Sequence, residues 1–350
     1  MLPYKRQARQ LISRFQRMSS TILVTGAHGF IGSALCSRLS DDNRVVGVDV
    51  KDGSFGREKI DREHADLTDW DSVASICEKY SPDVIIHCAG IAHQKIGAVD
   101  SATYMRVNSE ATENLARAAA ISKKNVTFIF LSSVSVYGED NLGVPVSEDS
   151  ECRPSSDYAA SKLDAERRLI ALFDEGVIHC LVILRLAPVY DREWSLNLNR
   201  RVFAPGKLAY LRFGSGSQKM SALARPNLVE FIQFLTHRLT QISADENNLS
   251  NLRINICDEE DYSFNRIIEI FKESGIRQDR PVVSVPFSPV WFATRIAGAL
   301  FSKKRDWIHS CYNKLAYDLV FDNRRMIGTG FSPRHSLETI FLTKTSLQNA

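Results

Sequence analysis

The sequence predicts an α/β protein built on a doubly wound parallel sheet, with a smaller, mainly C-terminal α/β part. Two observations lead to this class. From residue 21 onward, short apolar runs of strand length alternate with longer segments of helical periodicity, as in parallel strands joined by crossover helices. The runs are apolar at successive positions rather than at alternate ones, which is expected of strands buried on both faces.

Five runs in the first half are predicted as strands because they are rich in β-branched and other apolar residues: 21–25, 44–49, 84–87, 126–132 and 180–186. Helices are predicted between them at 31–39, 70–80, 105–121 and 157–173. After Pro188 the order is less regular, with loops expected around Pro205, Gly206, Gly214 and Gly216. There we expect helices at 227–239, 263–274 and 289–302 and strands at 252–257 and 281–285. The segments around Trp291 and Trp307 are expected to pack in the core or in a lid.

At 350 residues the chain has room for about two domains. We expect a basic N-terminal extension over residues 1–18 and a sheet domain over 19–187, to which residues 227–258 return. Residues 188–226 and 259–350 are expected to form a second domain. Because the first half is committed to the sheet, substrate recognition is expected in this second part.

Composition excludes several classes of protein. The chain has 44 Lys+Arg against 41 Asp+Glu, a formal charge of +3, which argues against a dedicated nucleic-acid binder. Seven scattered cysteines without a C-x-x-C pair indicate neither a disulfide framework nor a zinc site, and favour a reducing cytoplasm. No run of about 18 apolar residues is present, and the nearest candidate, 290–301, is short and contains Arg295. We therefore expect no integral membrane segment and no metal.

The first eighteen residues differ from the rest. They hold five basic side chains and no acidic one, so the remainder carries a formal charge of −2. Leu11, Ile12 and Phe15 fall on one face if this segment is helical. Three interpretations stay open: a start codon upstream of a functional start near Met18, an organelle transit peptide, or a peripheral membrane helix.

A glycine-rich turn lies directly between the first predicted strand and the first predicted helix. It reads Thr-Gly-Ala-His-Gly-Phe-Ile-Gly over residues 25–32, with the spacing G-x-x-G-x-x-G. Such glycines allow a tight turn and a close backbone approach, so that a pyrophosphate can lie against the N–H groups of the helix N-terminus. The second strand ends in Asp49, 23 residues after Gly26, where a carboxylate can bind the ribose hydroxyls.

These features predict a dinucleotide site that favours NAD. An acid at Asp49 repels a 2′-phosphate, whereas Lys51 and Arg57 keep NADP as the less favoured alternative. Asp66 is a candidate acceptor for the adenine amino group, and an ordinary helix-start aspartate is the equal alternative.

A second group of residues is a candidate for acid/base catalysis. Tyr158 and Lys162 are four residues apart, so on a helix they share one face. An ordinary tyrosine has a pKa near 10, but a nearby ammonium and an oxidised nicotinamide would both stabilise the phenolate. Ser133 lies at the end of a predicted strand, where α/β folds present site residues, and can hydrogen bond the same substrate oxygen.

With these motifs the chain resembles the extended short-chain dehydrogenase/reductase superfamily, and within it the NAD-dependent nucleotide-sugar epimerase/dehydratase family. The resemblance covers roughly residues 20–340. It is carried by the turn at 25–32, Asp49, Asp66-Leu67, the strand end at 86–90, Val107-Asn108, Thr112, Asn114-Leu115, the Ser-rich run at 132–138, Glu148, Pro154, Tyr158 with Lys162, the stretch 184–190 and the ending at 327–333.

The resemblance implies a Rossmann domain, a homodimer and a role for each matching residue. Tyr158 would be the acid/base, Lys162 would orient Tyr158 and the nicotinamide ribose, Ser133 would bind the substrate hydroxyl, and Asn108 would support the site. The implied cofactor contacts are Gly26, His28, Gly29, Phe30, Ile31, Gly32, Asp49, Asp66, Leu67, Ala89, Gly90, Asn108, Tyr158, Lys162 and Pro188.

The activity and the substrate expected within the family depend on two places where this chain differs from the family's motifs. The family's 4,6-dehydratases carry an Asp-Glu pair where this chain has Val134-Ser135, which disfavours dehydration. Pro226 stands where the family has an aspartate, so the diphosphate contact must fall to Lys219 or Arg225, with other arginines at 200, 201 and 212 as alternatives. His93 is a further candidate contact to the sugar.

These observations predict a cytoplasmic, NAD-dependent 4-epimerase of a UDP-hexose or UDP-N-acetylhexosamine, acting through a 4-keto intermediate. One alternative is an NAD(P)H-dependent 4-keto-sugar reductase or dehydrogenase of polysaccharide or O-antigen precursor synthesis, because it would use the same residues. A third alternative is an NAD-binding scaffold without turnover.

Overall fold

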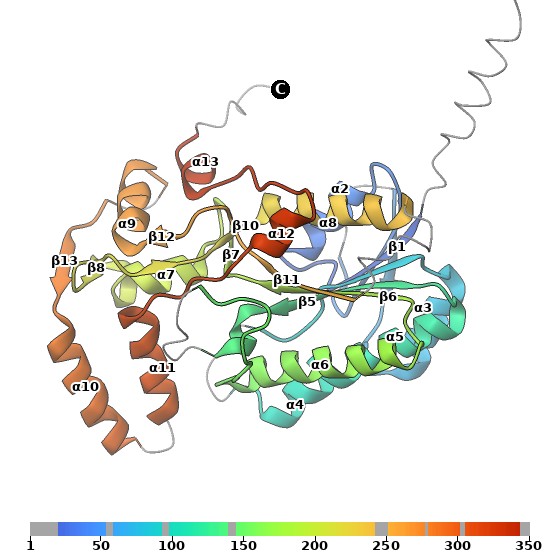
Figure 1. Ribbon diagram of the computed structural model, residues 1–350, viewed down its shortest axis with the longest axis horizontal. Helices are drawn as coiled ribbons and strands as arrows, with labels where there is room; N and C mark the ends of the chain where they lie inside the picture. Colours follow the sequence, from blue (N-terminus) through green and yellow to red (C-terminus); the bar gives the residue numbers. More distant parts are fainter. Residues whose placement is uncertain are drawn as a thin grey trace, which may run out of the picture.

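The computed structural model describes residues 20–53, 59–92, 98–138, 145–241, 251–276, 279–301 and 305–343. Its centre is a seven-stranded sheet in the order β11-β6-β5-β4-β1-β2-β3, with every neighbouring pair parallel (Figure 1). The strands are β1 (Thr21–Thr25), β2 (Arg44–Asp49), β3 (Ile60–His64), β4 (Val84–His87), β5 (Thr127–Ser133), β6 (Cys180–Leu186) and β11 (Asn251–Ile256). The predicted doubly wound parallel sheet is therefore confirmed.

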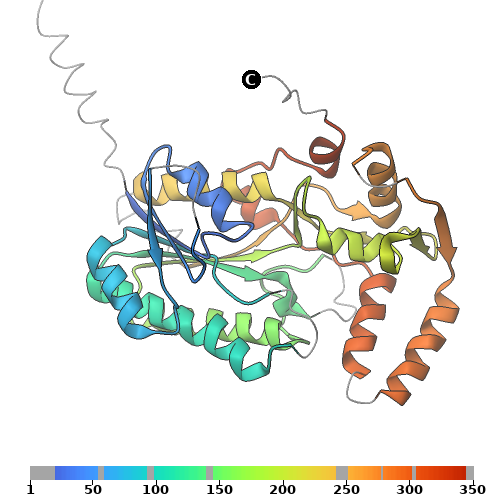
Figure 2. The ribbon, with the colours of Figure 1, turned by 180° about the vertical axis from the view of Figure 1, so that it is seen from behind.

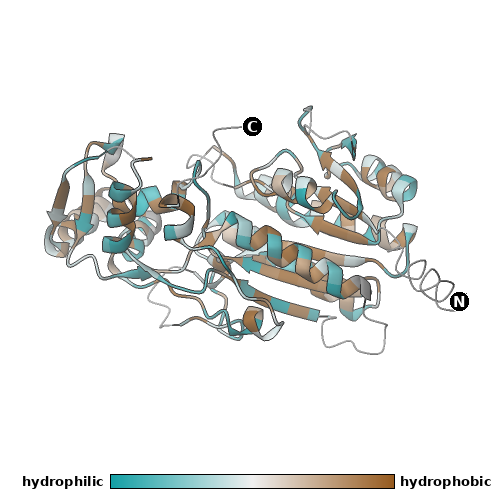
Figure 3. Ribbon diagram, turned by 90° about the horizontal axis from the view of Figure 1, so that it is seen from above, coloured by the Kyte–Doolittle hydropathy of each residue, from teal (hydrophilic) through white to brown (hydrophobic). Residues whose placement is uncertain are grey.

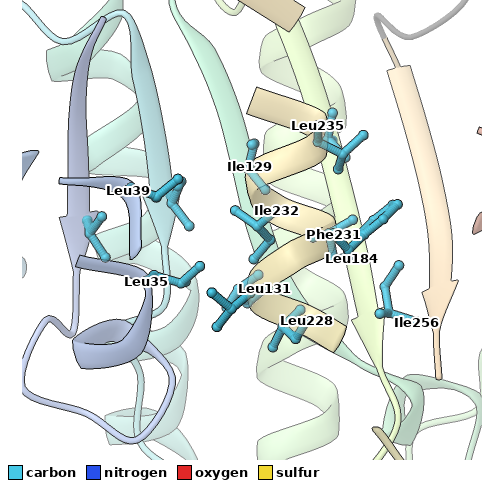
Figure 4. Close-up of a cluster of buried hydrophobic side chains, with 14 of the residues drawn as sticks. Leu35, Leu39, Ile129, Leu131, Leu184, Leu228, Phe231, Ile232, Leu235 and Ile256 are labelled. Carbon is cyan, nitrogen blue, oxygen red and sulfur yellow. The ribbon is translucent and has the colours of Figure 1, made fainter. Parts of the chain in front are cut away.

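Helices cover both faces of this sheet (Figure 1). One face is covered by α2 (Gly32–Leu39) and α8 (Arg225–Gln241), and the other by α3 (Trp70–Tyr80), α5 (Ala111–Ser122) and α6 (Asp157–Asp174). Figure 4 shows the first core, in which Leu35 of α2 and Phe231 of α8 lie over Leu131 of β5 and Leu184 of β6. The central strands are coloured as hydrophobic in Figure 3, as strands buried on both faces require.

Two elements of the sheet domain differ from the prediction. Strand β3 was not predicted, because its sequence, Ile-Asp-Arg-Glu-His, is polar. It lies at the sheet edge, where charged side chains on the exposed face are tolerated. The single helix predicted at 105–121 consists instead of α4 (Ser101–Met105), a π turn (Arg106–Glu110) and α5.

The rest of the chain forms a smaller part at one end of the sheet (Figure 2). Its strands are short, and they pair as β10 (Leu223–Ala224) with β7 (Val189–Tyr190), β12 (Tyr262–Ser263) with β9 (Lys219–Met220), and β13 (Val282–Val285) with β8 (Tyr210–Phe213). Its helices are α7 (Leu196–Val202), α9 (Phe264–Glu273), α10 (Phe287–Leu300), α11 (Arg305–Ala316), α12 (Arg324–Gly328) and α13 (Leu337–Phe341), with a 3-10 turn at Pro205–Lys207.

Trp291 is not a core residue, one of the two places expected for it. Its side chain is 42% exposed on α10, because the α10–α11 hairpin projects from the body of the protein (Figure 2). Residues 1–18 lie outside the described residues. None of the helices that the structure describes is long and apolar enough to cross a membrane. None of the seven cysteines, all of which lie in the described part of the chain, forms a disulfide.

Candidate functional site

The turn after β1 closes tightly around its glycines. Gly26 has a φ of +66°, and a Cβ there would lie 2.9 Å from the backbone of Ala89, at the end of β4. A Cβ on Gly32 would lie 2.2 Å from the carbonyl oxygen of Gly26. Helix α2 begins at this point without a side-chain cap from Ile31. The turn therefore brings a helix N-terminus and bare backbone to one place, which suits a pyrophosphate.

Asp49 faces this turn from the end of β2. Its Oδ2 accepts a hydrogen bond from the backbone N–H of His28 at 2.9 Å, and its Oδ1 accepts from that of Lys51 at 3.0 Å. The carboxylate is thus held beside the glycine turn, where it can meet ribose hydroxyls.

The other cofactor residues expected from the sequence lie at the same edge of the sheet. Phe30 and Ile31 belong to the turn, Leu67 follows β3, Ala89 and Gly90 follow β4, and Pro188 follows β6. The exposed Asp66 uses its Oδ1 to accept from the backbone N–H and the hydroxyl of Thr68, which forms a turn in the loop before α3, whereas Asp69 caps that helix. The contact of Asp66 with adenine stays a prediction. The turn and Asp49 fit a dinucleotide, since the tight backbone turn exists only with glycine at 26 and 32, where a Cβ would clash with the backbone of Ala89 and of Gly26.

Asn108 is fully buried in the π turn and ties together three segments of the site. Its side chain accepts from the N–H of Ile91 at 2.7 Å, donates to the carbonyl of Ile91 at 3.1 Å, and donates to the hydroxyl of Ser161 at 3.0 Å. Gly90 leaves the room for this, because a Cβ there would lie 2.9 Å from Asn108 Oδ1. The supporting role expected for Asn108 is consistent with these contacts, and π turns are common at functional sites.

Ser133 and Tyr158 meet across the carboxyl end of β5 and the start of α6. The Ser133 hydroxyl lies close enough to Tyr158 to lower its pKa, and it accepts hydrogen bonds from the backbone N–H and the hydroxyl of Ser135 at 3.2 and 2.9 Å. The ring of Tyr104 stands edge-on to that of Tyr158, with centroids 6.5 Å apart. Sequence reasoning missed Tyr104, although its spacing of four residues from Asn108 indicates a shared helix face.

Burial raises the pKa of Tyr158, while the nearby Ser133 hydroxyl lowers it. The expected lowering by the Lys162 ammonium is not the dominant effect. Lys162 is buried, its Nζ donates to the carbonyl of Leu131 at 2.9 Å, and it lies 4.6 Å from the centre of the Phe130 ring. Burial lowers the pKa of Lys162 to about 8. The Tyr158 phenol is therefore neutral at physiological pH, and the pKa of Lys162 lies much nearer to neutrality than that of an ordinary lysine.

A buried ion pair lies next to the site, between α6 and the sheet, and it was not predicted from the sequence. Arg185 of β6 and Glu166 of α6 are each 1% exposed, with Arg185 Nη2 and Glu166 Oε2 2.6 Å apart. Ser132 donates to Glu166 at 2.5 Å, and the Arg185 guanidinium lies 4.8 Å from the centre of the Tyr137 ring. The pair joins α6 to the ends of β5 and β6, next to Ser133.

The two residues expected to bind a diphosphate have different surroundings, and their contact with a diphosphate stays a prediction. Arg225 pairs with Asp191 at 2.6 Å and lies over the Phe30 ring, 4.5 Å from its centre, so it holds the glycine turn. Lys219 lines a cavity of about 480 Å³ together with five carboxylates, those of Asp258, Glu259, Asp261, Asp318 and Asp322. This acidic surrounding is unfavourable for an anionic ligand. His93 lies outside the described residues.

A larger cavity of about 800 Å³ opens at the start of the helix that carries Tyr158. On one side it is lined by Ser155, Ser156 and Asp157. On the other side it is lined by Arg305 and His309 of α11. A ligand in this cavity would lie between the sheet domain and the smaller part.

Comparison with known proteins places these features in context. Residues 22–247 match the model of the NAD dependent epimerase/dehydratase family. The chain is 29% identical over 334 residues to a UDP-glucose 4-epimerase of Vibrio cholerae, covering 93% of this chain and 94% of that protein. It is 33% identical over 161 residues to a dTDP-glucose 4,6-dehydratase of Haemophilus influenzae, covering 40% of this chain and 48% of that protein.

Among solved structures, the chain is similar to a UDP-glucose 4-epimerase of Brucella ovis in complex with NAD. The TM-score is 0.71 at 21% sequence identity, covering 92% of this chain and 96% of that chain. At this identity the likeness shows that the two proteins share a fold.

Proposed function

Because the chain belongs to the NAD dependent epimerase/dehydratase family, we propose that it is a 4-epimerase of a UDP-linked hexose or N-acetylhexosamine, acting through a 4-keto sugar. The observation that supports this most is the placement of Ser133, at the end of β5, beside Tyr158, at the start of α6, with Lys162 one helical turn further along α6. The glycine turn and Asp49 lie at the same edge of the sheet, so the cofactor and the acid/base group would meet there.

The proposed mechanism assigns one task to each side chain. Ser133 hydrogen bonds the 4-hydroxyl of the sugar and aligns it with Tyr158. The Tyr158 phenolate takes the proton of that hydroxyl and later returns it to the 4-keto oxygen. Lys162 favours the phenolate by its charge, and Asn108 fixes α6 through Ser161. NAD, when bound, supplies the hydride acceptor and, in its oxidised form, a positive charge near the phenol.

Two observations favour 4-epimerisation over dehydration. Val134 and Ser135 follow Ser133, and Val134 is buried in an apolar cluster, so no carboxylate pair is present at this point to eliminate water. The relative that aligns with 93% of the chain is a UDP-glucose 4-epimerase, whereas the dehydratase match covers 40%.

The test is to incubate the protein and catalytic NAD⁺ with UDP-glucose or UDP-N-acetylglucosamine and to separate the C4 epimers by chromatography. We expect a new epimer without net change in nicotinamide absorbance, and a loss of at least about 100-fold in rate for Tyr158→Phe, since general acid–base catalysis contributes that much. Tyr317→Phe, at a tyrosine that is 40% exposed, is the matched control.

Other outcomes would contradict the proposal. Reduction of a UDP-4-keto sugar with stoichiometric loss of NADH, without epimer formation, would identify a reductase. Unchanged activity of Tyr158→Phe would remove the assigned acid/base. Thermal unfolding and NAD titration of each variant would distinguish lost chemistry from lost folding.

A further inference from the structure

The α10–α11 hairpin carries an exposed apolar surface that the proposed reaction does not use. The hairpin projects from the smaller part of the protein, at the end far from β1 (Figures 1 and 2). Its two helices pack on each other, with Gly298 of α10 buried beside Arg305 and His309 of α11. The opposite face of α10 is turned to solvent.

This solvent face is a continuous stripe of large apolar side chains. Phe292, Ile296 and Leu300 are spaced by four residues and therefore lie above one another along the helix. They are 59%, 60% and 73% exposed, and Phe301 beyond the helix end is 60% exposed. Single exposed apolar residues are ordinary, but a stripe of this kind along one helix marks an interaction site.

The charges around the stripe indicate its partner. Arg295 is exposed at its edge, with its guanidinium 5.3 Å from the centre of the Trp291 ring. In the sequence, residues 281–305 contain four Lys or Arg and no Asp or Glu. An apolar face with an aromatic border and basic flanks is typical of helices that lie in the surface of an anionic bilayer.

We propose that the α10–α11 hairpin docks on anionic lipid membranes, with α10 lying in the interface and its stripe of Phe292, Ile296 and Leu300 facing the acyl chains. The 14 residues of α10 span about 21 Å, less than the roughly 30 Å of a bilayer core, so the helix lies on the membrane and does not cross it. A second copy of the chain fits less well, because two such faces would bring like basic charges together.

The docked hairpin would hold the candidate site near the membrane. Arg305 and His309 of α11 line the cavity at the start of α6, so the hairpin that meets the lipid also forms one wall of that cavity. This inference is independent of the reaction catalysed, since it depends on exposure and charge alone.

The experiment is sedimentation of the full-length protein with vesicles of phosphatidylcholine and of phosphatidylcholine containing phosphatidylglycerol. We expect binding to the anionic vesicles that weakens with added NaCl, and at least about tenfold weaker binding for the triple variant Phe292→Ser, Ile296→Ser, Leu300→Ser. Ile121→Ser and Leu208→Ser, at residues 78% and 71% exposed elsewhere, are matched controls that should bind as the wild type does. Because all variants keep residues 1–18, any contribution of that basic segment is constant.

A second readout reports the orientation of α10. Brominated lipids should quench tryptophan fluorescence in the wild type and in Trp70→Phe, and quench it less in Trp291→Phe. Absence of vesicle binding, or binding that the triple variant retains, would overturn the proposal. A wild-type dimer that becomes a monomer in the triple variant, without vesicle binding by either, would show that a second copy covers the stripe instead. Unchanged thermal unfolding of the triple variant verifies its fold.

Discussion

His87 is a fully buried imidazole that connects the glycine turn to the π turn. One ring nitrogen lies 2.6 Å from the hydroxyl of Thr25 and the other lies 2.8 Å from that of Thr112, which donates to the carbonyl of Asn108. Burial, together with the charge of Lys162, lowers the pKa of His87 to about 3. The imidazole is therefore neutral at physiological pH.

This burial predicts a dependence of stability on pH. In the unfolded chain His87 has a pKa of about 6.5, so between that value and pH 3 unfolding takes up a proton. The stability that depends on neutral His87 is present in full above about pH 6.5 and is lost as the pH falls. At pH 5 the free energy of unfolding is expected to be lower by about 2 kcal/mol. Urea unfolding at pH 7.5 and pH 5 should show this loss in the wild type and a smaller one in His87→Gln. His179→Gln, at an exposed histidine, should retain the wild-type loss, and an equal loss in His87→Gln would contradict the assignment.

The Asp49 carboxylate is expected to set the preference for NAD over NADP. Asp49→Asn keeps an oxygen that can accept from the N–H of His28 but removes the charge that repels a 2′-phosphate. We expect NAD to bind about tenfold more weakly and the preference for NAD over NADP to shrink, as measured by fluorescence titration. Asp52→Asn, in the exposed loop three residues on, is the control. An unchanged preference would show that Asp49 does not read the ribose.

At the scale of single elements, helix α6 depends on the buried pair of Glu166 and Arg185. Removing one partner of such a pair leaves an uncompensated buried charge. Glu166→Gln is therefore expected to lower the free energy of unfolding by about 3 kcal/mol, as measured by urea denaturation. The Glu166 carboxylate also raises the pKa of Lys162, so that pKa should fall in the variant.

The exposed pair of Glu151 and Arg153 offers the control for this prediction. Their side chains are 70% and 75% exposed, so Glu151→Gln should leave stability nearly unchanged. Replacing both buried partners, with Glu166→Leu and Arg185→Leu, should recover part of the loss, because no unpaired charge remains. A Glu166→Gln variant as stable as the wild type would show that the buried pair does not anchor α6.

The elements that sequence reasoning missed share a physical cause. The strands of the sheet centre were predicted closely because each is a short apolar run, as at 21–25 and 84–87. Strand β3 has only Ile60 buried, since it lies at the edge, and its pattern resembles a loop. The π turn was missed because a single extra residue within a helix leaves the apolar periodicity almost intact.

At the scale of the molecule, the sequence predicted site residues that belong to a short motif. It did not predict contacts between residues that are far apart in the sequence and meet only in the folded protein. Gly26, Asp49, Ser133 and Tyr158 were predicted because their short motifs follow one another in a set order between predicted strands and helices. The pairing of Arg225 with Asp191 depends on how the smaller part meets the sheet, so the sequence did not predict it. The exposure of Trp291 likewise follows from the projecting hairpin, which composition does not reveal.

The measurement that tests the central claim most directly uses UDP-glucose labelled with deuterium at C4. If the hydride removed from C4 is returned to C4 within the same site, the epimer formed with catalytic NAD⁺ will retain the label in full, and Tyr158→Phe will form almost none of it. An epimer that carries hydrogen at C4, or one formed equally well by Tyr158→Phe, would contradict the account.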